Sequence, residues 1–191
     1  MWNEFAKIGR LAWQQGLFSS HGGNMSVRVG DRILITRRGS MLGLLEKEDV
    51  IETSLLSNDT HITLASTEII VHRAIYKNTS ALAVFHAHPP CAVALSMLCG
   101  EIVLEDSEGS YILKKVPVVQ TTLTVGAKEV AEAIPGYLND FRVIMLKGHG
   151  SFAVGTLLEE AFSLTSSLEH SCRISHYMRA FNGESGKTCP W

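Results

Sequence analysis

The sequence predicts a layered α/β domain built around a mixed or mainly antiparallel sheet. Three observations indicate this class. Apolar residues recur at helical spacing near both ends of the chain, short apolar runs typical of strands lie between them, and glycine or proline punctuates the runs. The many short strand pieces favour a mixed or antiparallel sheet over a doubly wound one. The 191 residues, 46% of them hydrophobic, are enough for a single domain over residues 1–191.

The first part of the chain predicts a helix, a hairpin and a second helix. Phe5, Ile8 and Leu11 follow helical spacing in residues 2–16, and Gly16 ends that helix. The remaining segments follow in chain order. They are a glycine-rich turn at 19–24, a hairpin over 25–36 turning at Gly30-Asp31, a loop at 36–43, a strand at 48–52, a turn at 56–62, and a helix over 67–78 that Ser66 or Thr67 can cap.

The second part alternates buried strands with helices. The apolar run 80–88 predicts a strand that stops at Pro89-Pro90. An amphipathic helix over 126–134 should end before Pro135-Gly136, and the last long helix, 157–181, should end at Asn182-Gly183. The other predicted elements are a short helix at 90–98 and strands at 101–104, 110–115, 116–119, 142–146 and 151–155.

Charge and composition exclude several classes of function. The 17 basic and 19 acidic side chains give a net charge of −2, and no segment concentrates positive charge, so we expect neither a nucleic-acid nor a membrane partner. The sequence has no apolar run of the ~18–20 residues that cross a bilayer and no signal-peptide pattern, which predicts a cytoplasmic protein. The four cysteines, Cys91, Cys99, Cys172 and Cys189, form no CxxC pair, so we expect free thiols, with Cys91 and Cys99 in the core.

The segment HAH at 86–88 predicts two ligands of a metal site. Residues i and i+2 of a strand point to the same side, so His86 and His88 should aim their rings at one point. Because Pro89 stops the strand, we expect the pair at a sheet edge, where a site can open to solvent. Neutral imidazole is the commonest zinc ligand, and catalytic zinc usually takes three protein ligands.

The best third ligand in the sequence is His149. It follows the apolar run 142–146 and lies between Gly148 and Gly150, which permit unusual backbone angles and close approach. His72, four residues after Glu68 on one helix face, and His21, beside the glycine turn, are competing ligands. A structural alternative is that these are separate polar residues at strand ends, each hydrogen-bonded to a neighbour. His61, His170 and His176 are expected on the surface without a role.

An acid and several anion-binding groups accompany the histidines. Glu68 falls in the first turn of the predicted helix, where it could simply stabilise the helix dipole or take part in chemistry. Ser66 and Thr67 offer hydroxyl and N–H groups at the same helix start, which favours an anion such as phosphate. Two further loops supply donors for an anion, through Gly22, Gly23 and Asn24 and through Arg37, Arg38 and Gly39.

In this order, these motifs resemble the class II aldolase/adducin family over nearly the whole chain. The matching segments are GNMSVR at 23–28, ITRRG at 35–39, STE at 66–68, HAH at 86–88, HG at 149–150 and SLEHSCRI at 167–174. The resemblance implies a three-layer α/β/α sandwich around a mainly antiparallel sheet. It also implies a homotetramer with active sites at subunit interfaces.

The resemblance also assigns roles to individual residues. His86, His88 and His149 become the ligands of one Zn²⁺ per subunit, and Glu68 becomes the acid/base and a fourth ligand while substrate is absent. Gly23, Asn24, Gly39, Ser66 and Thr67 match the phosphate-binding positions of the family. Arg38 replaces the usual threonine or serine and could also bind phosphate. The C-terminal tail lacks the tyrosine of some members, and Tyr111 lies near the place of a second tyrosine without matching it clearly.

The implied activity is that of a zinc-dependent aldehyde-lyase. It would reversibly cleave a ketose 1-phosphate such as L-fuculose 1-phosphate to dihydroxyacetone phosphate and a small aldehyde. Three alternatives stay open: a methylthioribulose-1-phosphate dehydratase, a pentulose-phosphate 4-epimerase, which has Asp at the position of Glu68, and a non-catalytic adducin-like interaction domain, whose members have lost the zinc ligands that this chain retains.

Overall fold

A single mixed sheet of eight strands forms the centre of the molecule in the computed structural model, which describes residues 1–126 and 128–185. The strand order is β3-β2-β1-β4-β8-β7-β6-β5, and every neighbouring pair is antiparallel except β6 and β7. The strands are β1 (Asn24–Val29), β2 (Arg32–Thr36), β3 (Val50–Ser54), β4 (Ala83–Ala87), β5 (Glu101–Val103), β6 (Lys115–Val119), β7 (Val143–Leu146) and β8 (Gly150–Gly155).

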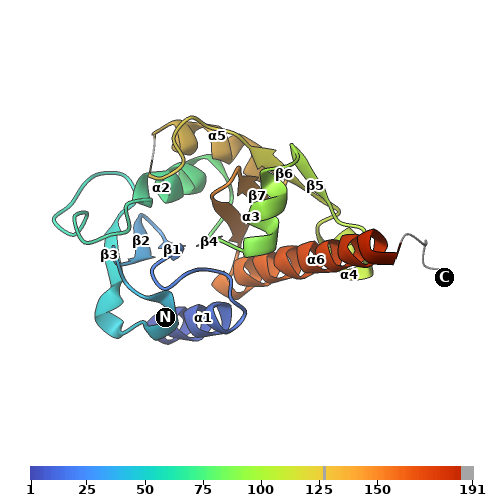
Figure 1. Ribbon diagram of the computed structural model, residues 1–191. Helices are drawn as coiled ribbons and strands as arrows, with labels where there is room; N and C mark the ends of the chain where they lie inside the picture. Colours follow the sequence, from blue (N-terminus) through green and yellow to red (C-terminus); the bar gives the residue numbers. More distant parts are fainter. Residues whose placement is uncertain (127, 186–191) are drawn as a thin grey trace.

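Helices cover both faces of the sheet, which confirms the predicted α/β/α sandwich (Figure 1). On one face lie α1 (Trp2–Gln14), α3 (Pro90–Ser96), α4 (Ser107–Ile112) and α6 (Leu158–Ser185), and on the other lie α2 (Ile69–Asn78) and α5 (Lys128–Leu138). Two short 3-10 helices, η1 (Leu42–Leu44) and η2 (Lys47–Asp49), lie between β2 and β3.

The alternation of side chains along β4 divides the core into two layers. Phe85 packs among α1 and α6 side chains, whereas Val84 packs with residues of α2 and α5. Successive residues of a strand face opposite sides, so His86 shares the α2 and α5 side with Val84. All five residues of β4 are buried, as expected for a strand that is covered on both faces. The site described below therefore belongs to the α2 and α5 side of the sheet.

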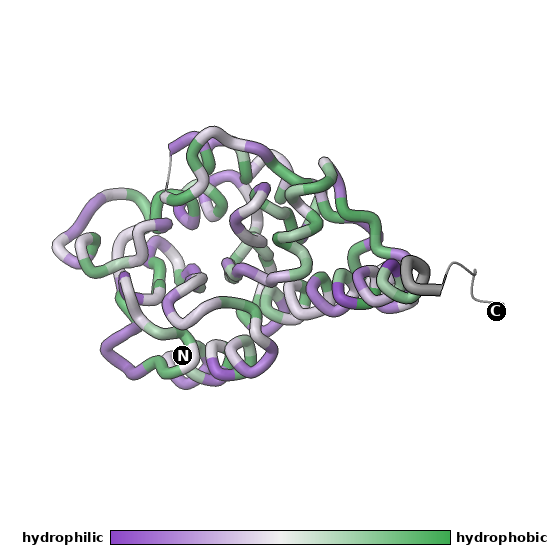
Figure 2. The backbone as a smooth tube through the Cα atoms, in the orientation of Figure 1, coloured by the Kyte–Doolittle hydropathy of each residue, from purple (hydrophilic) through white to green (hydrophobic). Residues whose placement is uncertain are grey.

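The long helix α6 packs beneath the sheet and continues past it. Hydrophilic and hydrophobic residues both occur along its length (Figure 2). Leu164 and Leu168 enter the core, while Met178 is exposed. None of the described helices combines the length and hydropathy that a bilayer crossing requires.

The strand predicted at 110–115 was wrong. Residues 107–112 form α4 instead, and the adjacent strand β6 begins only at Lys115. Asp106 is the N-cap of α4, and its Oδ2 accepts a hydrogen bond of 2.9 Å from the amide of Gly109. A side-chain oxygen that satisfies a free amide favours a helix start, and this local signal outweighed the strand preference of Tyr111 and Ile112.

Two predicted helix ends were also wrong. Helix α5 continues through Pro135 to Leu138, because Val130, Ile134 and Leu138 bury an apolar stripe that outweighs the hydrogen bond lost at proline. Helix α6 likewise continues beyond Asn182-Gly183 to Ser185.

The placement of the cysteines corrects another prediction. Cys91 and Cys99 are only half-buried, whereas Cys172 is completely buried in the core; all three are free thiols. The segment after Pro90 forms the predicted short helix, and one face of that helix is turned toward solvent, so Cys91 and Cys99 lie at the margin of the core. Cys189 lies outside the described residues.

Candidate metal centre

His86 and His88 lie at the C-terminal end of β4, in the interior of the sheet. β4 pairs with β1 on one side and β8 on the other, with His86 opposite Asn24 and Phe152. The prediction of a sheet edge was therefore wrong. Pro89 stops the strand lengthwise, but both sides of β4 are paired, so the site opens beyond the strand end rather than beside the strand.

His149 reaches the same place from the turn between β7 and β8. Gly148 has a φ of +67°, a left-handed conformation that favours glycine. At Gly150 a Cβ atom would lie 2.3 Å from the carbonyl oxygen of Ala87 and 2.7 Å from Cδ2 of His88, so a larger residue would collide with the cluster. The flanking glycines thus allow the approach that the sequence predicted.

The three imidazoles converge on one point. One ring nitrogen from each of His86, His88 and His149 lies within 4.8 Å of the others. Nε2 of His86 is 3.0 Å from Nε2 of His88. Two nitrogens on one tetrahedral zinc ion would be about 3.3 Å apart, given bonds of about 2.0–2.1 Å. The spacing therefore suits three ligands of a single divalent ion.

The tautomer of His86 leaves a lone pair aimed into this cluster. Its Nδ1 lies 2.9 Å from the carbonyl oxygen of Ser151, which can only accept, so Nδ1 carries the hydrogen and Nε2 does not. Nε2 faces both Nε2 of His88 and, at 3.2 Å, Oε2 of Glu68. One hydrogen on His88 could bridge only one of these contacts. A metal ligand with its other N–H on a backbone carbonyl has this same arrangement.

Burial keeps these rings in the form that binds metals. Desolvation, reinforced by His149, lowers the pKa of His86 to about 3. Desolvation also lowers the pKa of His88 to about 3, with smaller contributions from His86 and His149. Both rings are therefore neutral near pH 7, and a neutral imidazole is the ligand form.

Glu68 completes the cluster from the start of α2. It is the N-cap residue, one position before the helix, and its side chain is buried. Oε2 accepts a hydrogen bond of 2.9 Å from Nδ2 of Asn24. Among the described residues, Oε1 of Glu68 and Nδ1 of His149 are buried without a hydrogen-bond partner. Buried polar atoms are rarely left unpaired, so these two atoms point to a bound group. Three imidazoles and a carboxylate fit a divalent cation.

A cavity of about 180 Å³ joins the cluster to the predicted anion-binding loops. All ten predicted site residues line it: Gly23, Asn24, Arg38, Gly39, Ser66, Thr67, Glu68, His86, His88 and His149. Ser40 and Val125 also line it and were missed, because neither carries a motif in the sequence. Arg37 is engaged by Asp49 at 2.7 Å, whereas Arg38 is exposed at the cavity and its guanidinium makes no hydrogen bond or ion pair with the described residues.

The remaining histidines do not join the triad. His72 is completely buried and bonds to Asn24 and Ser26, and His21 is exposed at the cavity, bonded to Ser20. His61, His170 and His176 are exposed, as predicted.

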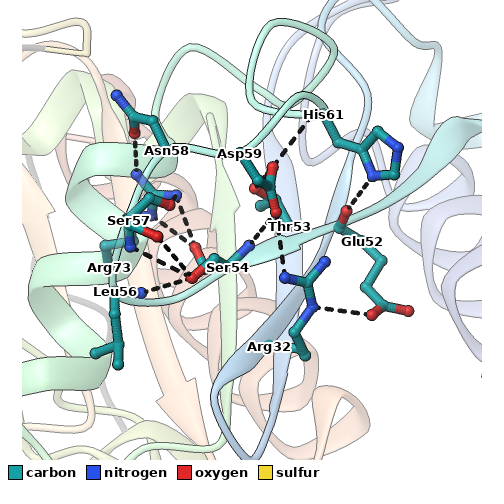
Figure 3. A network of polar contacts seen from close by, with 10 residues as sticks. All are labelled: Arg32, Glu52, Thr53, Ser54, Leu56, Ser57, Asn58, Asp59, His61 and Arg73. Atoms are coloured by element: carbon teal, nitrogen blue, oxygen red, sulfur yellow. Dashed lines mark hydrogen bonds and ion pairs between the residues drawn. The ribbon is translucent and has the colours of Figure 1, made fainter.

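His61 nevertheless has a structural contact, because its Nδ1 donates to the carbonyl of Glu52 (Figure 3). Tyr111 is exposed on α4 and does not line the cavity.

Comparison with known proteins agrees with this architecture. A family model described as "Class II Aldolase and Adducin N-terminal domain" matches residues 3–176. The L-fuculose phosphate aldolase of Methanococcus maripaludis is 34% identical over 176 residues, which are 92% of this chain and 96% of that protein. The crystal structure of L-fuculose-1-phosphate aldolase from Thermus thermophilus superposes with a TM-score of 0.92 at 37% identity, covering 98% of this chain and 97% of that one.

A relative with a different activity also aligns. The 3-oxo-tetronate 4-phosphate decarboxylase of Haemophilus influenzae is 29% identical over 179 residues, 88% of this chain and 83% of that protein. The fold, the clustered histidines and the family match together place the chain in the class II aldolase and adducin family. Within that family, fuculose-phosphate aldolases are among its similar relatives.

Proposed function

We propose that this chain is a metal-dependent aldehyde-lyase that reversibly cleaves a ketose 1-phosphate to dihydroxyacetone phosphate and a small aldehyde. The observation that carries the proposal is the lone pair of His86 Nε2, which faces a second imidazole and a carboxylate with too few hydrogens to bridge them. L-Fuculose 1-phosphate is the first substrate to test, since the similar aldolases are named for it.

In this proposal His86, His88 and His149 hold one Zn²⁺ per subunit, with Glu68 as a fourth ligand while substrate is absent. The three imidazoles favour zinc among the common divalent ions. When bound, the ion would act as a Lewis acid toward the ketone and hydroxyl oxygens of the substrate, where negative charge develops.

Glu68 is the proposed acid/base. During cleavage the carbon–carbon bond between the two fragments breaks, the hydroxyl group that becomes the aldehyde gives up its proton, and Glu68 delivers a proton to the carbon next to the ketone. In the reverse direction Glu68 removes that proton, and the hydroxyl group regains one. Oε2 is held by the Asn24 amide and faces His86, which leaves Oε1, buried and without a partner among the described residues, as the atom that exchanges the proton.

The other end of the cavity is the proposed phosphate site. Ser66 and Thr67 precede α2, whose N-terminus attracts anions, and Gly23 and Gly39 supply backbone close to the cavity. Arg38 would add a positive charge there. Nδ2 of Asn24 carries two hydrogens and donates one to Glu68, so the second is available to a ligand as far as the described residues go. The phosphate contacts lie away from the reacting carbons, and binding the phosphate would hold those carbons in position for the reaction.

A decarboxylase is the second candidate, favoured by the Haemophilus influenzae relative and by Arg38, whose guanidinium has no partner within the described part of the chain and could bind a carboxylate as well as a phosphate. Both reactions leave negative charge next to the carbonyl of a phosphorylated sugar. The dehydratase and the epimerase stay predictions, as do the single domain over residues 1–191, the homotetramer with interfacial sites and the cytoplasmic location.

The decisive experiment is a substrate panel with the zinc-loaded chain. It would contain several ketose 1-phosphates, methylthioribulose 1-phosphate, ribulose 5-phosphate and 3-oxo-tetronate 4-phosphate. We expect dihydroxyacetone phosphate from a ketose 1-phosphate and a large loss of rate after chelation. Carbon dioxide, dehydrated sugar or epimer as the main product would replace the aldolase assignment. Turnover that survives complete metal removal would contradict the proposed role of the ion.

A further inference from the structure

A chain of buried side chains leads from the cavity into the core behind Glu68. Asn24 Nδ2 is 2.9 Å from Glu68 Oε2, and Asn24 Oδ1 is 2.6 Å from Nε2 of His72. Nδ1 of His72 is 2.7 Å from the hydroxyl of Ser26, which is 2.6 Å from the hydroxyl of Tyr76. All five residues are at most 7% exposed, so water does not compete for these bonds.

The hydrogen bonds in this series of side chains all run in the same direction, from Tyr76 toward Glu68. Because the nitrogen of the Asn24 amide serves Glu68, only its oxygen faces His72, so Nε2 of His72 carries a hydrogen and donates it. Burial lowers the pKa of His72 to about 3, so the ring is neutral and Nδ1 must accept. Ser26 then donates to His72 and accepts from Tyr76. The sequence of donors ends on the carboxylate.

We propose that His72 is a positioning residue, which holds the Asn24 amide so that its nitrogen fixes Oε2 of Glu68 and leaves Oε1 free. This inference rests on the proposed function of Glu68. His72 does not line the cavity, and its side-chain bond toward Glu68 runs through Asn24. Its ring also contacts Phe152, which stacks on His86, but both variants described below lose that ring contact. Without the donor at Nε2, the Asn24 amide could turn its oxygen toward Glu68. That orientation would repel the carboxylate and displace it from the position that proton transfer needs.

Two substitutions separate this role from simple core packing. His72→Gln places an amide nitrogen near the position of Nε2 and preserves the donor to Asn24. His72→Asn places an amide oxygen near the position of Nδ1 and preserves the contact to Ser26, but it loses that donor. Both variants remove the imidazole ring, so they share the same packing defect. They differ in whether the side chain can donate a hydrogen bond to Asn24.

The test measures kcat, KM, zinc content and melting temperature for His72→Asn and His72→Gln with the substrate that the parent cleaves. We expect kcat of His72→Asn to fall about 10–100-fold, as for other groups that orient metal-site ligands, with KM and zinc content within about 2-fold. His72→Gln should keep kcat within about 3-fold of the parent. Equal losses in both variants, or losses shared by KM and zinc content, would overturn the proposal.

A second measurement does not depend on turnover. Nitrogen-15 NMR of the His72 ring in the parent chain should show hydrogen on Nε2, both with and without zinc. Hydrogen on Nδ1 would reverse the bond directions and overturn the positioning role, even if His72→Asn fails to fold. If the parent cleaves none of the phosphates, the proposed function fails by itself, and the NMR result still decides how the Asn24 amide is held.

Discussion

Polar side chains cluster both in the loop between β3 and α2 and in the cavity beyond β4. The two clusters differ in whether their polar groups have hydrogen-bond partners. In the loop, Asp59 accepts four hydrogen bonds, from Thr53, the amides of Ser54 and His61, and Arg32 (Figure 3). Arg73 adds bonds to the carbonyls of Ser54 and Ser57 and to the Asn58 side chain (Figure 3).

The cavity has the reverse pattern. Its groups are more deeply buried, yet Nε2 of His86 faces both an imidazole nitrogen and a carboxylate oxygen, and Oε1 of Glu68 lacks a partner among the described residues. A hydrogen-bond network in which every group has a partner holds the backbone in place and needs no ligand. Buried polar groups without partners lower the stability of the fold unless a ligand binds them. The comparison therefore separates a structural cluster from a functional one by their unpaired atoms rather than by residue type.

The largest expected effect tests the functional cluster. His88→Ala should abolish activity and reduce zinc from one ion to near none per chain, because it removes one of the three converging imidazoles that hold the ion in the proposed site. Metal analysis of the purified protein and the cleavage assay measure this effect. His21→Ala is the matched control, since His21 also lines the cavity but lies outside the triad, and it should keep its zinc.

The stability of His88→Ala tests whether the cavity cluster, unlike the loop around Asp59, contributes little to folding. Metal-free His88→Ala should melt within about 3 °C of the metal-free parent, because His88 is only half-buried and its Nε2 contacts another imidazole nitrogen rather than a charged partner. A much lower melting temperature would mean that His88 mainly stabilises the fold, and the distinction between the two clusters would fail.

A smaller effect is expected from the carboxylate of the cavity. Glu68→Gln keeps the shape of the side chain and removes its ability to take a proton, so turnover should fall by roughly 10²–10⁴ while zinc stays bound. Steady-state kinetics beside metal analysis would show this separation. A variant as active as the parent would remove Glu68 from the mechanism.

The smallest effect belongs to the loop. Hydrogen bonds from Thr53 first, then from Ser54, His61 and Arg32, lower the pKa of Asp59 to about 2 against the opposing effect of burial. A carboxylate with a lowered pKa stabilises the fold above its ordinary pKa of about 4, and this stabilisation is lost as the pH falls through about 2.

Asp59→Asn should therefore lower the melting temperature at pH 7, and the difference from the parent should shrink between about pH 4 and pH 2. Thermal melts over this range measure it. Zinc content and kcat should not change. A difference that is constant with pH would show that the charge of Asp59 does not matter to the loop.

The meeting of the candidate residues at one cavity was easier to predict from the sequence than several element boundaries. Histidines spaced by two in a strand, and a histidine between glycines, carry geometric restrictions in their own spacing, and the structure brings all three together. The family resemblance added the anion-binding loops, which line the same cavity. Ser40 and Val125 could not be found, because only the folding of distant loops brings them to the cavity.

The errors have a common physical origin. The end of α5 and the position of β4 inside the sheet depend on packing between distant segments, which no local pattern encodes. The start of α4 did carry a local signal, the Asp106 cap, which the strand-like residues after it obscured. The buried chain behind Glu68 joins residues 44–50 positions apart, so its bonds could not be read from the sequence.

The interior position of β4 has a kinetic consequence for any ion held at its end. Rim strands fray first, but the backbone that carries His86 is paired with β1 and β8, so it separates only when the sheet itself comes apart. An ion at this place would leave by the mouth of the cavity while the protein stays folded. Its residence time would then be set by its own rate of dissociation from the folded protein, independent of how readily the chain unfolds.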